Sequence, residues 1–144
     1  MASLTPFTEV TRDQAIAAFG GSGQAAQYCD GQIVVVGGAI LLFATLGEGL
    51  DQTRLKASDS LEWRPRRNDY HPGEEIPWLP AAAIPRYDRD HKAWATRSHI
   101  LLQRKAHAGR WLYCGAAHLG SYALGRRTDP PGAGGQWALC PPGK

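Results

Sequence analysis

Residues 32–45 read QIVVVGGAILLFAT, two apolar runs joined by Gly37 and Gly38. β-Branched and large apolar residues are typical of strands, and a Gly-Gly pair between two such runs favours a two-residue hairpin turn. We therefore expect 32–36 and 39–45 to pair as a hairpin in the core. A continuous strand kinked by a glycine bulge is the competing interpretation.

A second hairpin is predicted further along the chain. Residues 98–105 (SHILLQRK) and 110–115 (RWLYCG) are strand-like and are joined by a turn at 106–109. Large apolar residues occur on both faces of these runs, as in strands from the middle of a fold. Shorter strands are expected at 121–124 and 136–139, and alternation over 51–63 predicts two more.

One helix is expected ahead of the strands. Thr11-Arg-Asp-Gln14 has the form of a capping box, and Ala15, Ile16 and Phe19 then place an apolar stripe on one side. Gly20 follows the stripe, as glycine often follows a helix. The pattern predicts a short helix over about 12–19.

The order of these elements predicts the fold class. The chain has 144 residues, a common size for one domain, and shows no internal repeat. We expect a single α+β domain over 1–144, with a curved antiparallel sheet or small open β-barrel, flanked by the N-terminal helix and crossed by an irregular segment at 65–94.

Composition argues against several classes of protein. No apolar run approaches the ~20 residues of a membrane helix, and the first residues lack the pattern of a signal peptide. We therefore expect no membrane partner and a cytoplasmic location. The three cysteines, Cys29, Cys114 and Cys140, form no C-x-x-C pair, so we expect reduced thiols, no metal and no other cofactor.

The charge balance is only mildly basic. The net charge is +3, and twelve of the sixteen cations are arginines. Arginine forms forked contacts with phosphates and stacks on aromatic planes. The distribution of the arginines therefore indicates more about a partner than the net charge does.

Aromatic residues and arginines interleave in the middle of the chain. The irregular segment at 65–93 contains five of the ten prolines, and long irregular connections are often functional. Aromatic planes beside arginines suit stacking of unpaired bases together with phosphate contacts. The expected nucleic-acid-binding residues are Trp63, Tyr70 and Trp94 for stacking, and Arg64, Arg66, Arg67, Arg104 and Lys105 for the backbone. The competing interpretation is that the tryptophans only anchor this segment to the core.

Two other function classes stay open. A metal-dependent nuclease could use Asp88 or Asp90 with Gln103 and Lys105, although glutamine stands where a second carboxylate would be needed. A protein-interaction module would dock a partner on the aromatic segment. The residues favour a binding module without catalytic residues over an enzyme.

Four stretches also carry a family resemblance: 11–19, 61–66 (LEWRPR), 99–105 (HILLQRK) and 111–115 (WLYCG). In this order they resemble a domain of unknown function at the C-terminus of superfamily II helicases in bacterial defence loci. The Arg64-Pro65-Arg66 segment departs from the polar S-Q of that family. The resemblance implies a DNA-facing accessory or reader role. Together these observations predict a non-catalytic module that binds nucleic acid, DNA foremost, with a modified or flipped-out base as the finer hypothesis.

Overall fold

The stretch at 32–45 forms the hairpin that its sequence predicts. In the computed structural model, Val36 pairs with Ala39 across the two glycines. Gly37 has a φ of 56°, while Gly38 lies outside the left-handed region. This is the pattern of a type II′ turn, in which glycine takes the first central position. The hairpin interpretation is confirmed, and the continuous kinked strand is not formed.

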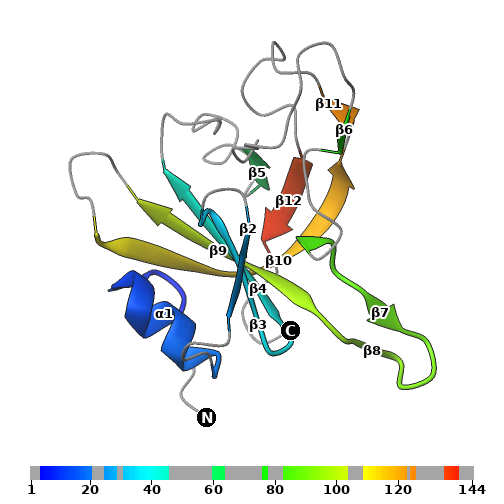
Figure 1. The fold of residues 1–144 in the computed structure, drawn as a ribbon, viewed down its shortest axis with the longest axis horizontal. Coiled ribbons are helices and arrows are strands. Elements are labelled where there is room, and N and C mark those ends of the chain that lie inside the picture. Colours follow the sequence, from blue (N-terminus) through cyan, green and yellow to red (C-terminus); the bar gives the residue numbers. More distant parts are fainter. Residues whose placement is uncertain are drawn as a thin grey trace.

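The structure describes residues 4–20, 25–28, 31–45, 60–63, 76–77, 83–103, 109–122, 124–125 and 135–139. Figure 1 shows the helix and strands within these ranges. Their bounds, in chain order, are β1 (Thr8–Val10), α1 (Arg12–Ala18), β2 (Ala26–Tyr28), β3 (Ile33–Val36), β4 (Ala39–Thr45), β5 (Ser60–Trp63), β6 (Ile76–Pro77), β7 (Tyr87–Asp88), β8 (Ala93–Trp94), β9 (Arg97–Gln103), β10 (Trp111–Tyr122), β11 (Leu124–Gly125) and β12 (Gly135–Leu139).

Among the described residues, the main sheet has eight strands: seven follow the order β2-β3-β4-β9-β10-β12-β5, and β1 pairs with β10 outside this order. It is open and mixed, because β4 and β9 run parallel while the other ladders among the described strands are antiparallel. A parallel pair needs a long crossover, and the chain between 45 and 97 provides it. The predicted class, α+β with a curved sheet and an N-terminal helix, is confirmed.

Strand β10 is the longest element and curves the sheet. Its register with β9 shifts between Tyr113 and Gly115, and its register with β12 shifts between Leu119 and Ser121. Gly115 has a φ of 104°, and bulges of this kind bend a strand. We predicted that the strand ends at Gly115 and that a separate strand begins at Ser121. That prediction was wrong, because β10 continues to Tyr122 through both irregularities.

Two apolar layers lie on the two faces of the central strands. On one face Val34, Leu41, Phe43 and Leu101 are buried beneath α1, which contributes Ala15. The opposite face buries another set of apolar residues, with Ala83 packed among them: Ile33, Ile40, Leu42, Ala44, Ile100, Leu102, Cys114 and Ala117. Alternate residues of β4 therefore face opposite layers, which explains its uninterrupted apolar sequence.

The helix begins as its capping box predicts. The Thr11 hydroxyl accepts a hydrogen bond from the Gln14 backbone N–H at 3.1 Å, and the Gln14 side chain accepts one from the Thr11 N–H at 2.9 Å. Phe19 is the C-cap. This seven-residue helix is too short to cross a membrane, and the described residues contain no helix long and apolar enough to do so.

Candidate nucleic-acid interface

The eight predicted binding residues are placed very unevenly by the structure. Trp94 lies on β8 with 42% of its surface exposed. Trp63 ends β5, where its backbone pairs with Gly135 of β12. The other six lie outside the described residues, so their placement stays a prediction: Arg64, Arg66, Arg67, Tyr70, Arg104 and Lys105.

Trp63 and Trp94 belong to different parts of the fold. Strand β8 leads into β9, and β5 lies three strands beyond β9 in the sheet. At the usual spacing between strands, β9 and β5 are about 14 Å apart. The Trp94 ring contacts His118 of β10, whereas Trp63 pairs through Gly135 with Tyr122, four residues or about 13 Å further along that strand. The described backbone therefore does not bring these two predicted stacking residues together, and any site at Trp94 has to be built from its own neighbours.

Those neighbours come from a short hairpin, which we name the aromatic hairpin and define as residues 86–95. Tyr87 pairs with Trp94 and Asp88 with Ala93, so that four residues form the loop. The ribbon projects away from the main sheet, at the lower right of Figure 1. We expected residues 65–93 to be irregular, and that expectation was wrong for this hairpin.

The base of the aromatic hairpin is anchored to the core. The Ala95 N–H donates to the Arg86 carbonyl at 2.8 Å, and the Arg86 N–H donates to the Thr96 hydroxyl, also at 2.8 Å. Thr96 is buried, and the next residue, Arg97, donates its N–H to the Gly38 carbonyl at 2.9 Å. These hydrogen bonds therefore hold the base of the aromatic hairpin against the β3–β4 turn and the start of β9, and both of these belong to the main sheet.

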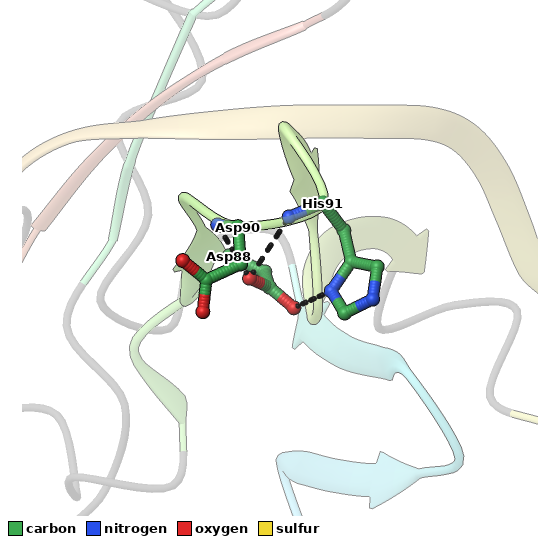
Figure 2. A network of polar contacts seen from close by, with 3 residues as sticks. All are labelled: Asp88, Asp90 and His91. Atoms are coloured by element: carbon green, nitrogen blue, oxygen red, sulfur yellow. Dashed lines mark hydrogen bonds and ion pairs between the residues drawn. The ribbon is translucent and has the colours of Figure 1, made fainter.

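The tip is held by Asp88, as Figure 2 shows. One oxygen of its carboxylate accepts hydrogen bonds from the N–H groups of Asp90 at 3.0 Å and His91 at 3.2 Å. The other oxygen lies 2.6 Å from His91 Nδ1. The side-chain hydrogen bond from His91, followed by the backbone bonds, lowers the pKa of Asp88. Asp88 is thus an ionised loop-closing residue.

Three aromatic rings form a row from the hairpin to the sheet. The Tyr87 and Trp94 rings meet edge to face, with centroids 5.2 Å apart and planes at 71°. The Trp94 and His118 centroids are 6.1 Å apart. Tyr87 is 50% exposed, and His118 is exposed on β10. The row is therefore open to solvent even though its members contact one another.

The hairpin and the two residues after it carry a positive balance. From 86 to 97 there are four cations and two acidic residues, so the net charge is +2 with His91 neutral. Three of the cations, Arg86, Arg89 and Lys92, are exposed, and Arg97 is half-buried. Exposed cations beside exposed rings favour an anionic partner that also has planar groups.

The described residues give little support to the nuclease alternative. Asp88 and Gln103 lie at opposite ends of the segment that runs from the hairpin through β9. The Gln103 amide donates to the Thr45 hydroxyl at 2.9 Å and accepts from the Gly109 N–H at 3.3 Å. No cluster of three potential metal-binding side chains occurs in the described ranges, and Lys105 lies outside them.

A second histidine, His99 on β9, is partly buried in the fold. His99 Nδ1 lies 2.9 Å from the Tyr113 hydroxyl, and the His99 ring packs against Phe19 with centroids 4.5 Å apart. Burial, and then the charge of Arg97, lower the pKa of His99 to about 4. The His99 ring is neutral at pH 7 and lies against the C-terminal end of α1. We therefore assign His99 a structural role.

Three residues of this site, Arg86, Tyr87 and Arg89, belong to the interleaved cluster of aromatic residues and arginines in the sequence, although they are not among the eight predicted binding residues. His118 was not predicted as a binding residue. Tyr87 and Trp94 flank a polar run, DRDHKA, and that symmetry was the available signal for a hairpin. His118 had no comparable signal, because its contact with Trp94 depends on how the hairpin meets β10.

Comparison of the chain with protein-family models, with curated proteins and with solved structures gave no match. The functional proposal therefore depends on the site alone.

Proposed function

We propose that this protein is a non-catalytic module that binds nucleic acid, with DNA the foremost ligand. The observation that carries the proposal is the exposed Tyr87–Trp94 pair on a projecting hairpin, next to the exposed cations Arg86 and Arg89. Nucleic acids combine a negative backbone with planar bases, and a surface that offers both cations and rings complements them.

The geometry favours this function over the two alternatives. A nuclease would need several carboxylates free to hold a metal, whereas both oxygens of Asp88 are engaged in closing the hairpin loop. Of the two candidate aspartates only Asp90 is then left, and the described residues place no cluster of metal-binding side chains around it. A protein partner would also accept exposed aromatics, but it gives no reason for three cations within the hairpin. The helicase-associated resemblance, a role in defence, recognition of modified or flipped-out bases, and the cytoplasmic location stay predictions.

The test is binding measured against salt. Fluorescence anisotropy with labelled DNA of about 20 nucleotides, single-stranded and duplex, should give a Kd that rises steeply from about 50 to about 200 mM salt, because phosphate contacts release counterions. Replacing Arg86 and Arg89 by alanine should reduce the slope of log K against log salt by about 0.7–0.9 for each phosphate that is no longer neutralised.

Arg110→Ala is the matched control for these substitutions. Arg110 is an exposed arginine at the start of β10 that pairs with Glu9 at 3.6 Å, away from the hairpin. We expect the control to bind as the unmodified protein does. An absence of binding at low salt would refute the proposal, and a partner whose affinity is insensitive to salt would favour protein recognition.

A further inference from the structure

We propose that the aromatic hairpin selects unpaired bases, so that the ligand is single-stranded or locally unpaired nucleic acid rather than intact duplex. This inference rests on the proposed nucleic-acid binding and names the ligand class of the same site. The rings that stack on the unpaired bases are those of Tyr87 and Trp94, and Arg86 and Arg89 lie beside them in the sequence.

Ring geometry is the first argument. Because the Tyr87 and Trp94 planes are 71° apart, the edge of one ring meets the face of the other. An edge-to-face pair leaves ring faces that are not stacked on a partner, and exposures of 50% and 42% show that solvent reaches these side chains. A base has the shape and polarisability to cover such a face.

The structure of duplex DNA is the second argument. Bases within a duplex already cover each other's faces, and a protein in the grooves meets only their edges. A base can stack on a protein ring only if it is unpaired, or if it leaves the duplex and gives up its stacking there. A single strand therefore gains the full stacking contribution, which is roughly 5- to 150-fold in Kd for each base.

Pre-organisation is the third argument. Thr96 and Gly38 fix the base of the hairpin through hydrogen bonds, and Asp88 closes its loop with three more. A ring held in position before binding loses little conformational freedom when a base stacks on it. The hairpin thus presents its rings without needing a ligand to order them.

The positions of the cations agree with this arrangement. Arg86 immediately precedes Tyr87, and Arg89 and Lys92 lie in the loop, all exposed. Phosphates flanking a stacked base would meet positive charge at both ends of the ribbon. Asp90 is the one carboxylate of the hairpin whose side chain takes no part in the described loop-closing bonds, and it is exposed.

The experiment compares three probes at about 100 mM salt: a dT strand of about 15 nucleotides, a duplex of the same length, and that duplex with a bulge of a few thymines. We expect the dT strand to bind at least about tenfold more tightly than the duplex, with the bulged duplex between them. Trp94→Leu and Tyr87→Leu should each weaken binding of the dT strand about 5-fold or more, with little effect on the duplex.

Two variants keep the result interpretable. Phe7→Leu removes an aromatic side chain that is 64% exposed but lies outside the hairpin, and it should bind like the unmodified protein. Trp94→Phe keeps a ring on the hairpin and should retain much of the affinity, which separates loss of stacking from loss of the fold.

The outcomes distinguish the two proposals. Equal affinity for all three probes, with Trp94→Leu and Phe7→Leu unchanged, would overturn the selection of unpaired bases and leave nucleic-acid binding intact. No binding to any probe would overturn both.

Discussion

A Cβ atom added at Gly38 would lie 3.0 Å from the carbonyl oxygen of Ala95. Gly38 belongs to the turn of the core hairpin, and Ala95 to the base of the aromatic hairpin. The two hairpins therefore approach so closely that a side chain at position 38 would require the Ala95 carbonyl to move by a few tenths of an ångström. The exposed turn of the core hairpin and the base of the proposed binding element meet at this point.

Substitution of Gly38 by alanine should disturb both elements. We expect Gly38→Ala to lower the free energy of unfolding by about 1 kcal/mol or more, since the atom in the way is backbone and not a mobile side chain. Urea denaturation followed by circular dichroism measures this. A variant as stable as the unmodified protein would show that the β3–β4 turn and the base of the aromatic hairpin move apart at little cost in free energy.

The helix cap should make a measurable contribution to stability. Thr11→Ala removes the hydroxyl that accepts the Gln14 N–H and should cost about 1 kcal/mol. Thr11→Ser keeps the acceptor and should cost much less. Thermal denaturation of the two variants compares them directly, and equal melting temperatures would show that the cap is not needed.

Stability should fall in acid because the partial burial of His99 disfavours its charged form. Its pKa of about 4 in the folded state lies below the ordinary value of 6.5, so the unfolded chain binds the proton more readily. The contribution of neutral His99 to the free energy of unfolding is fully present above pH 6.5. As the pH falls towards 4, the loss of this contribution lowers the free energy of unfolding by up to about 3 kcal/mol.

The substitution His99→Gln isolates this effect. A neutral glutamine does not titrate, so the difference in unfolding free energy between the two proteins should change between about pH 7 and pH 4. Other titrating groups are common to both proteins and cancel in the comparison. A difference that is independent of pH, measured by urea denaturation, would contradict the assignment.

Removal of one negative charge from the hairpin should strengthen binding. Asp90→Asn raises the net charge of residues 86–97 from +2 to +3 and keeps the backbone N–H that donates to Asp88. We expect roughly a twofold tighter Kd for DNA at about 50 mM salt and a smaller gain at about 200 mM. Asp13→Asn, on α1, provides the control. Unchanged affinity in Asp90→Asn would place the ligand elsewhere.

Elements whose signal is local could be predicted from the sequence. The glycine pair at 37–38 lies between two apolar runs, and the capping residues of α1 satisfy each other within four positions. Such patterns depend on neighbours in the chain, so they can be recognised without knowing the fold.

Features that depend on distant contacts were harder to predict. Nothing in β4 or β9 specifies that Leu42 meets Ile100 in a parallel ladder, because many apolar strands would fit the same neighbour. Gly115 was predicted to end a strand, although it forms a bulge within one. The aromatic hairpin was missed because its strands are two residues long and mostly exposed, so that they carry no periodic apolar pattern.

Backbone amide resonances, followed by NMR while the dT strand is added, locate the binding surface most directly. We predict that the largest shifts fall within residues 86–95 and at His118, while the amides of α1 stay where they are. Shifts that gather on α1 and β1, with the aromatic hairpin unmoved at saturation, would refute the proposed site.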